Sequence, residues 1–553
     1  MSARWTLLSR RLWPVLGMII SVSHAHGGDA PLHQQVDALI SAKLKGQAVS
    51  PATDDAEFLR RVWLDFDGGI PSAGEVRAFL ADPSPTKRTA LLDKLIASPR
   101  FATRMGDAFD VMLMERRGEN AAWREWLTAS FQANKPWDAM VREMLAPDFT
   151  DERMRGAGWF ITRRLEKVGQ QDTDYPGLTR DVGRMFMGVD LQCCQCHRHL
   201  TVNDYKQADF SGLFTVYQNL KLQPADGVHK VPWVSEGVIA AKYEFASVLT
   251  GSKGQTGPRI PFSEEVSIPD LKGDEAWLVK PDRKTKEIGR PKFSPLQEIA
   301  QRLPTPENPL FARNAANRVW FLLMGGGLVE PLDFNHGENP ASHPELLDLL
   351  AKEFAAHQFD LRWLIRELAL TQTYARTSVL PENTTQGAAG GRTYTTARER
   401  HLTAAQMTRA FLIATAELDR VTKTAKADPA SDDKKYTLPD FEKAFIAALA
   451  NAPKEPELQV NPTLRSSLFL RNGDHVLWAV KPRAGNLVER VMKLPTPDAM
   501  AEELYLSILT RMPDAEEKTM FSTWMNKPGV EKATAVGDFA WALLSSTEWF
   551  VNH

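Results

Sequence analysis

Apolar residues recur every three or four positions along most of the chain, a spacing that predicts amphipathic helices. In 57–66, for example, Phe58, Val62 and Phe66 fall on one helical face. A helix over 87–97 is expected to end at Ser98 and Pro99. Similar patterns predict helices over 32–44, 72–80, 123–131, 137–145, 178–189, 205–217, 291–303, 314–324, 346–354, 361–374, 499–509 and 536–549. The expected fold is therefore mainly α, with multi-helical N-terminal and C-terminal domains.

The pattern changes between these two helical parts. Residues 242–249 alternate between polar and apolar, and glycines at 251, 254 and 257 are expected to turn the chain before 259–262 resumes the strand. This predicts a small β insertion, and exposed loops are expected at 384–396 and 424–435. The expected division is a signal peptide over 1–25, a helical domain over 31–225, a β-rich insertion over 226–290 and a helical domain over 291–553.

The first residues have the character of a secretory signal. Arg4, Arg10 and Arg11 precede an apolar run over 12–22, and small residues at 23 and 25 suit a cleavage site after Ala25. We therefore expect a periplasmic or otherwise exported protein. An uncleaved anchor is the alternative, but the run is shorter than the ~20 residues that a spanning helix needs, and no later segment reaches that length.

Composition narrows the class of partner. The 553 residues include 67 Lys and Arg against 69 Asp and Glu, a net charge of −2, so no basic surface for nucleic acid is expected. A chain of this length is expected to form two or three domains.

All three cysteines lie within four positions, at Cys193, Cys194 and Cys196. Cys193-x-x-Cys196-His197 has the spacing of a c-type haem attachment site, in which two thiols bond the porphyrin and the histidine binds iron. Clustered cysteines do not suit a disulfide framework, which would spread its bridges over the domains. The sequence predicts covalent haem c on Cys193 and Cys196, with His197 as the iron ligand. His199 is expected to support the cofactor site, because it is too close to His197 to reach the opposite face of the ring.

Two alternatives remain open for the cysteine cluster. One is a zinc site built from Cys193, Cys196, either His197 or His199, and a remote ligand such as Asp204. The other is a disulfide among the cysteines. If haem is bound, the candidates for the sixth iron ligand are Met185, Met187, His229, His336 and His343, and Arg198 could face the iron or the solvent.

Two other polar groups are weaker candidates. Asp333, His336, Glu338 and His343 lie on a Gly-, Asn- and Pro-rich stretch, which suits a second metal, a sugar-binding rim or an ordinary loop. Asp65 and Asp67 lie near the Gly68-Gly69 turn and could form a carboxylate pair, although turn chemistry explains them more simply. No catalytic residue is assigned.

Three blocks of the chain together resemble one family. Its hallmarks here are Arg60-Arg61-Val62-Trp63 near the N-terminus, the block from Phe186 through the cysteines to Leu213, and Asn317-Arg318-Val319-Trp320 with Ser342-His343-Pro344 beyond it. The chain resembles exported proteins of planctomycete-type bacteria that pair domains of unknown function fifteen-forty-nine and fifteen-fifty-three, often coupled to cytochrome c domains. The resemblance implies a periplasmic, haem-associated protein linked to redox steps in the use of complex polysaccharides.

The chain departs from that family pattern around the motif. Cys194 stands where the family usually has Ala, and Arg198 and Leu200 replace Asp and Pro. No separate cytochrome c domain precedes the motif, so any haem must be held by the motif itself. The expected function is a redox reaction or electron transfer with a periplasmic redox partner or a polysaccharide-derived substrate. The alternative is a non-enzymatic structural or carbohydrate-binding protein whose cluster holds zinc or a disulfide.

Overall fold

The computed structural model describes residues 30–44, 46–381, 392–428, 430, 435–455 and 463–553. The expected signal peptide lies outside these residues, and the two expected loops are described only in part. The mainly α prediction is confirmed, since the only sheets among the described residues are four antiparallel two-stranded pairs. Within the same residues, no helix combines the length and apolar character needed to span a bilayer.

Helices form the N-terminal two-fifths of the chain. They are α1 (Leu32–Leu44), α2 (Asp55–Phe66), α3 (Ala73–Ala81), α4 (Lys87–Ile96), α5 (Pro99–Met114), α6 (Ala121–Gln132), α7 (Trp137–Leu145), η1 (Arg155–Gly158), α8 (Trp159–Leu165), α9 (Tyr175–Met187), η2 (Gln192–Gln195) and α10 (Gln207–Tyr217). Local signals set their ends. Ser72, for example, starts α3 with a reciprocal capping box to Glu75.

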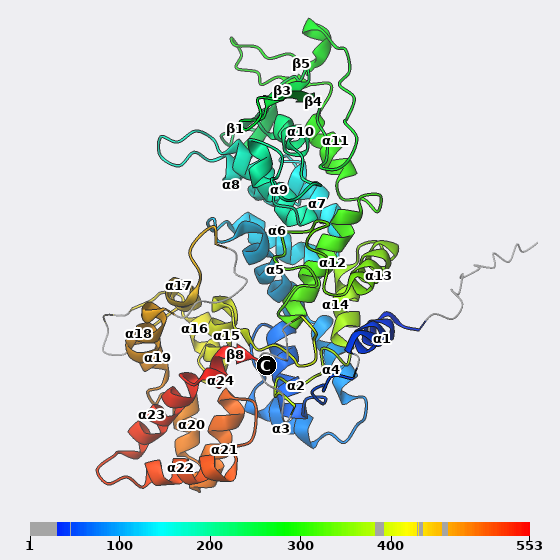
Figure 1. Cartoon of the computed structure of the whole chain (residues 1–553). Coiled ribbons are helices and arrows are strands. Elements are labelled where there is room, and N and C mark those ends of the chain that lie inside the picture. Colours follow the sequence, from blue (N-terminus) through cyan, green and yellow to red (C-terminus); the bar gives the residue numbers. More distant parts are fainter. Residues whose placement is uncertain (1–29, 45, 382–391, 429, 431–434, 456–462) are drawn as a thin grey trace, which may run out of the picture.

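The strands are short, and most of them follow α10 and precede the later helices in the sequence; Figure 1 shows β1, β3, β4 and β5 at one end of the molecule. β1 (Leu220–Gln223) pairs with β2 (Trp233–Glu236), β3 (Tyr243–Ala246) with β4 (Lys253–Thr256), β5 (Trp277–Val279) with β6 (Arg290–Pro291), and β7 (Arg400–His401) with β8 (Val551–Asn552). A short 3₁₀ helix, η3 (Gly273–Ala276), precedes β5.

The prediction that 259–262 resumes the strand is wrong. The strand that pairs with β3 is β4, where Gly254 lies opposite Phe245. A side chain at Gly254 would collide with that ring, which explains a glycine inside a strand. Pro258 and Pro261 cannot donate ladder hydrogen bonds, and 259–262 packs on α10 instead, where the Phe262 N–H donates to Asp209.

The C-terminal half is again helical. It contains α11 (Pro295–Arg302), α12 (Pro309–Met324), α13 (Pro344–Ala356), α14 (Leu361–Ala369), α15 (Ala404–Ala414), α16 (Leu418–Lys423), α17 (Leu438–Leu449), α18 (Leu464–Asn472), α19 (Asp474–Ala479), α20 (Leu487–Met492), α21 (Pro497–Ile508), α22 (Ala515–Met525), α23 (Lys532–Leu544) and α24 (Thr547–Phe550).

Buried side chains divide these helices into two main cores. The first core joins residues of 32–220 with residues of 260–394, so α12, α13 and α14 pack with the N-terminal helices. The second core is built from 402–549, and Leu64 and Ile70 extend into it from the N-terminal part. α2 and the turn after it therefore contact both cores.

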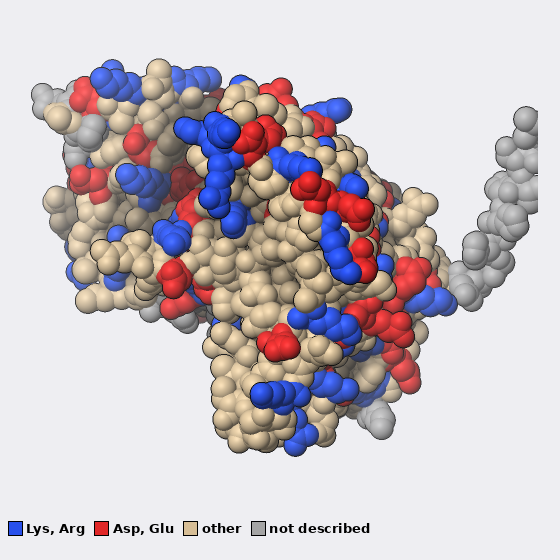
Figure 2. Space-filling model, turned by 90° about the horizontal axis from the view of Figure 1, so that it is seen from above, with Lys and Arg blue, Asp and Glu red and all other residues tan. Residues whose placement is uncertain are grey.

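Charges are mixed over one face of the molecule. The face in Figure 2 shows Lys and Arg interspersed with Asp and Glu, without an extended area of one sign. This agrees with the near-equal numbers of basic and acidic residues.

Candidate functional site

The end of α9 directs the cysteine segment. Gly188 ends this helix with φ of 68°, a left-handed conformation that favours glycine. A Cβ there would approach Asn314 Oδ1 to 2.8 Å, so the site is also too narrow for a side chain. Beyond the turn, the chain pairs with a remote loop: the Asn335 N–H donates to the Gly188 carbonyl (2.9 Å) and the Asp190 N–H to the Asp333 carbonyl (2.9 Å).

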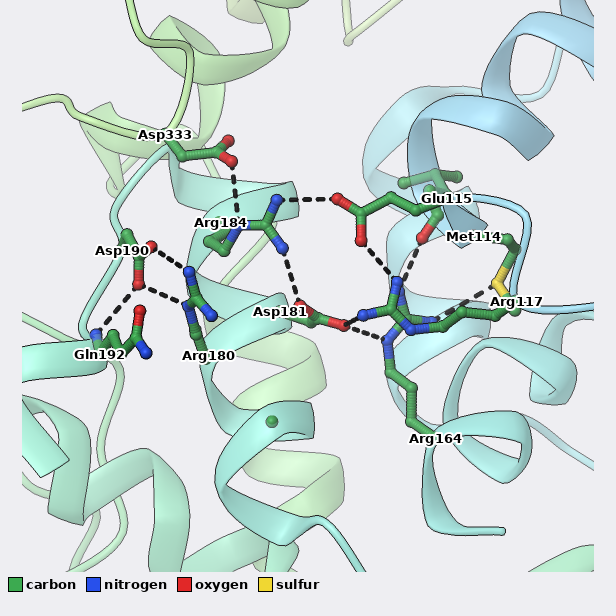
Figure 3. Close-up of polar contacts among 12 residues, drawn as sticks. Met114, Glu115, Arg117, Arg164, Arg180, Asp181, Arg184, Asp190, Gln192 and Asp333 are labelled. Carbon is green, nitrogen blue, oxygen red and sulfur yellow. Dashed lines mark hydrogen bonds and ion pairs between the residues drawn. The ribbon is translucent and has the colours of Figure 1, made fainter. Parts of the chain in front are cut away.

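Asp190 fixes the entry to the motif. Its carboxylate accepts two hydrogen bonds from Arg180, at 2.8 and 2.6 Å, and a third from the Gln192 backbone N–H at 3.0 Å (Figure 3). Bidentate Arg–carboxylate pairs hold both position and orientation. The segment that leads into η2 is therefore tied to α9 through Arg180, ten residues before Asp190.

A buried ion network lies behind this segment (Figure 3). Arg184 on α9 binds Asp333 (2.9 Å), Glu115 (2.7 Å) and Asp181 (3.0 Å), and Arg164 on α8 binds Asp181 (2.8 Å). Burial lowers the pKa of Arg184, but the carboxylates, Asp333 foremost, more than reverse this and raise it. The network joins α5, α8, α9 and the 333–335 loop into one support for the motif.

The three thiols have different environments. Cys193 and Cys196 are exposed, whereas Cys194 is fully buried in the first core, and all three are free in the structure. Burial raises the pKa of the Cys194 thiol to about 12. The two cysteines at haem-attachment spacing are thus accessible, and the third is a packing residue.

The two motif histidines also differ. His197 Nδ1 lies 2.5 Å from the Arg198 carbonyl, to which it donates, leaving Nε2 with a free lone pair suited to a metal. His199 Nδ1 instead accepts from the backbone N–H groups of Val202 (3.0 Å) and Thr201 (3.3 Å). A neutral His199 therefore carries its proton on Nε2 and shapes the loop that follows His197.

These residues fit covalent haem attachment. Both thiols can be reached from solvent, and His197 Nε2 is available to iron. Since Cys193 and Cys196 lie at the surface, a porphyrin bonded to them would rest against the outside of the helical domain.

The zinc alternative fits the geometry less well. Among the described residues, no group of three or more His, Cys, Asp or Glu is arranged to hold a metal ion. The Asp204 carboxylate accepts from the Gly337 N–H at 3.1 Å, and His199 Nδ1 is used within its own loop. A site made from these groups would require the loop to rearrange.

For three of the five candidates for the sixth iron ligand, contacts within the protein explain the position of the side chain. Met185 and Met187 are buried in the first core. His229 stacks on Trp233, with ring centroids 4.0 Å apart, and its Nδ1 lies 2.9 Å from Asp226.

The two remaining histidines lie apart from one another. His343 is buried at the start of α13 beside Tyr394, and burial lowers its pKa to about 4. His336 is in ring contact with Tyr205 (5.5 Å), whose ring in turn contacts His199 (5.9 Å). Of the five candidates, His336 is the one connected to the motif loop by these contacts, and its Nε2 is buried without a hydrogen-bond partner.

The acidic and histidine residues of the 333–343 stretch do not converge on one point. Asp333 belongs to the buried ion network, His336 lies 3.3 Å from Glu338, and His343 packs elsewhere on Tyr394. A single metal site made from all four is therefore not formed.

Asp65 and Asp67 form ion pairs with different arginines. Asp65 binds both terminal nitrogens of Arg400, at 2.9 and 2.8 Å, while Asp67 accepts from Arg409 at 2.8 Å. Gly68, with φ of 85°, makes the turn after them. The pair is used in structural contacts rather than as a shared carboxylate site.

A cavity of about 1000 Å³ opens next to the motif loop. Phe262 is at its wall, with φ of 65° and its side chain 41% exposed, and the buried Asp209 holds the Phe262 N–H at 3.0 Å. The remaining wall combines charged, amide and apolar groups: Asn203, Asp204, Tyr205, Lys206, Arg259, Ser263, Glu264, Leu310, Arg313, Asn335, His336, Gly337, Asn339, Pro340, Ala341 and Pro344.

Several residues that shape the site were missed by the sequence reasoning. Asp190 lies three positions before Cys193 and was available as a signal, because a carboxylate there can cap the turn that follows. Arg180 and Asn335 act through contacts made only after folding, and no local pattern identifies them.

Comparison with known proteins gives two matches. Residues 35–222 match a family model described as PSCyt2, protein of unknown function (DUF1549), and residues 297–450 match PSD1, protein of unknown function (DUF1553). The first match contains the whole cysteine motif. No curated protein and no solved structure matched the chain.

Proposed function

The chain belongs to the family of proteins that pair DUF1549 with DUF1553, and from this premise we propose that it is an exported c-type haem protein serving a periplasmic redox reaction or electron transfer. The observation that carries the proposal is the arrangement at Cys193, Cys196 and His197. Two free, exposed thiols stand at haem-attachment spacing, and the following imidazole has Nδ1 bonded and Nε2 available.

Each residue of the motif has a separate role in this proposal. Cys193 and Cys196 would form the thioether bonds to the haem, and His197 Nε2 would bind its iron. The bound haem supplies one-electron transfer. Asp190 and His199 hold the segment in place through their backbone hydrogen bonds.

Covalent haem is the decisive measurement. The full chain, co-expressed with a cytochrome c maturation system, should be exported with one haem per chain, as measured by a pyridine haemochrome spectrum and intact mass. Cys193→Ala and Cys196→Ala should each lose one thioether bond. Cys194→Ala is the matched control and should keep the full haem content, because this thiol is buried.

Two results would contradict the haem proposal. A wild-type chain that matures without covalent haem and contains one zinc per chain would overturn the proposal. Cys194→Ala losing haem as completely as Cys193→Ala would contradict the assignment of the attachment pair.

A carbohydrate-binding protein is the second candidate, and the cavity beside the motif loop favours it. The half-exposed Phe262 ring and polar groups such as Asp204 and Asn335 offer apolar and hydrogen-bonding contacts to a polyhydroxylated ligand. Calorimetric titration with neutral and acidic oligosaccharides tests this, with Phe262→Ala expected to weaken any binding. Binding that is unchanged in Phe262→Ala would exclude this cavity.

A further inference from the structure

The hairpin of β3 and β4 ends in a closed turn. The Ser247 N–H donates to the Ser252 carbonyl (2.9 Å), and the Gly251 N–H donates to the Ser247 carbonyl (2.8 Å). Gly251 has φ of 69°, which suits a tight reversal. Three residues lie between Ser247 and Gly251, and the first two of them, Val248 and Leu249, are the apolar residues of the hairpin tip.

This tip is attached to the cysteine motif. The Val248 N–H donates to the carbonyl of Cys196 at 3.0 Å. A second hydrogen bond, from the buried Gln207 side chain to the Ala246 carbonyl (3.1 Å), ties the same hairpin to α10. Figure 1 shows β3 and β4 beside α10 at one end of the molecule. The hairpin therefore holds a set position relative to one of the two attachment thiols.

The side chains of the tip are apolar and face solvent. Val248 is 71% exposed and Leu249 60% exposed, and Leu200, three residues after His197, is 73% exposed. Single exposed apolar side chains are ordinary on protein surfaces. These three differ because Leu200 follows the cysteine motif in the same segment, and Val248 and Leu249 lie on the hairpin tip that is hydrogen-bonded to the Cys196 carbonyl.

We propose that Val248 and Leu249, with Leu200, form the apolar seat of the porphyrin bonded to Cys193 and Cys196. This inference rests on the proposed haem function. A porphyrin joined through two thioether bonds stays close to the backbone of its motif, and the Cys196 carbonyl holds Val248 there. The macrocycle is flat and apolar, so it would cover these side chains and they would exclude water from it.

If these side chains exclude water from the haem, they should affect its reduction potential. The ferric haem carries one more positive charge than the ferrous haem, and solvent favours the more charged form. Polar side chains in the seat should therefore lower the reduction potential without changing the attachment chemistry.

The test uses the exported holoprotein. Val248→Ser/Leu249→Ser should keep one haem per chain but show a lower midpoint potential in spectroelectrochemical titration. The control is Leu464→Ser on α18, an apolar residue that is 77% exposed and lies in a distant part of the molecule (Figure 1). The control should leave the potential at its wild-type value.

Amide hydrogen exchange provides a second readout that does not depend on potential. Amides of 247–251 should exchange more slowly in the holoprotein than in the haem-free Cys193→Ala/Cys196→Ala chain. Equal potentials for the seat variant and wild type, together with equal exchange in both forms, would overturn the seat while leaving the haem assignment intact. A wild-type chain without covalent haem would overturn both proposals.

Discussion

At the scale of single residues, burial separates three cysteines that are almost adjacent in sequence. Cys194 is fully buried, and burial raises the pKa of its thiol to about 12, so it stays protonated at pH 8. We expect iodoacetamide to alkylate Cys193 and Cys196 of the native haem-free protein and to spare Cys194. Peptide mass spectrometry against time measures this.

The same reagent applied in denaturant should modify all three cysteines equally. Native labelling of Cys194 at the rate of Cys193 would show that the packing around it is open.

His343 makes stability depend on pH. Burial lowers the pKa of His343 from 6.5 to about 4, so the unfolded chain binds this proton more readily than the folded chain. The contribution of neutral His343 to the free energy of unfolding is complete above pH 6.5. It is lost as the pH falls from 6.5 to about 4, by at most about 1.4 kcal/mol per pH unit. Urea unfolding at pH 7 and pH 5 measures the loss.

His343→Leu provides the comparison for that measurement. This variant should show a smaller fall in the free energy of unfolding between pH 7 and pH 5 than the wild type. An identical fall in both proteins would assign the pH dependence to other groups.

The sequence was sufficient to identify the Cys-x-x-Cys-His motif, but it did not show which contacts the nearby residues make. The Cys-x-x-Cys-His spacing is local, and the sequence shows it directly. The hydrogen bonds that distinguish His197 from His199 depend on the turn between them, and the partners of Asp333 and Asp65 lie far away in sequence.

At the scale of elements, the end of α5 depends on the buried ion network. Glu115 and Arg116 follow this helix with φ of 45° and 53°, a conformation unfavourable for residues other than glycine. The Glu115 carboxylate is held by Arg184 at 2.7 Å and by Arg117 at 2.5 Å. The strained helix end and the motif support therefore rely on the same arginine.

Arg184→Leu tests this dependence. It leaves Glu115, Asp181 and Asp333 with fewer partners, and removing one member of a buried ion pair costs about 3–5 kcal/mol. We expect a loss of that size in the free energy of urea unfolding. Arg302→Leu, which removes an exposed pair with Glu298, should change it by less than about 1 kcal/mol.

Equal stability of these two variants would show that the network contributes no more than a surface ion pair. Loss of stability with retained haem attachment would separate the support of the helix from the chemistry of the motif.

Periodicity predicted most helices, and its failures have physical causes. The expected helix end at Ser98 and Pro99 is confirmed, since α4 ends at Ile96 with Ala97 as its C-cap. The helix that begins there was missed: Ser98 caps α5 and Pro99 opens it, because proline lacks the N–H that the first turn leaves free. The strand β4 was missed because Gly254 is typical of a turn, and only the folded chain shows that Phe245 covers it. Both omissions concern residues that suit two kinds of local structure, and tertiary contacts decide between them.

At the scale of the whole molecule, α2 connects the two cores through one carboxylate. Asp65 binds Arg400, 335 positions later, and also accepts from Tyr374 Oη (2.7 Å) and Asn552 Nδ2 (2.9 Å). Its neighbour Leu64 is buried in the second core. No sequence pattern predicts these contacts of Asp65, because the residues that make them belong to no common motif and are far apart in the sequence.

Asp65→Ala should therefore weaken the coupling between the cores. It leaves the Arg400 guanidinium without its carboxylate and removes hydrogen bonds to Tyr374 and Asn552, a loss we expect to be about 3–5 kcal/mol. By calorimetry we expect one unfolding transition for the wild type and two for Asp65→Ala, with the second core melting first. Asp93→Ala removes an exposed ion pair with Arg366 and should keep one transition near the wild-type temperature. One unshifted transition in Asp65→Ala would mean that the apolar contacts of α2 alone couple the cores.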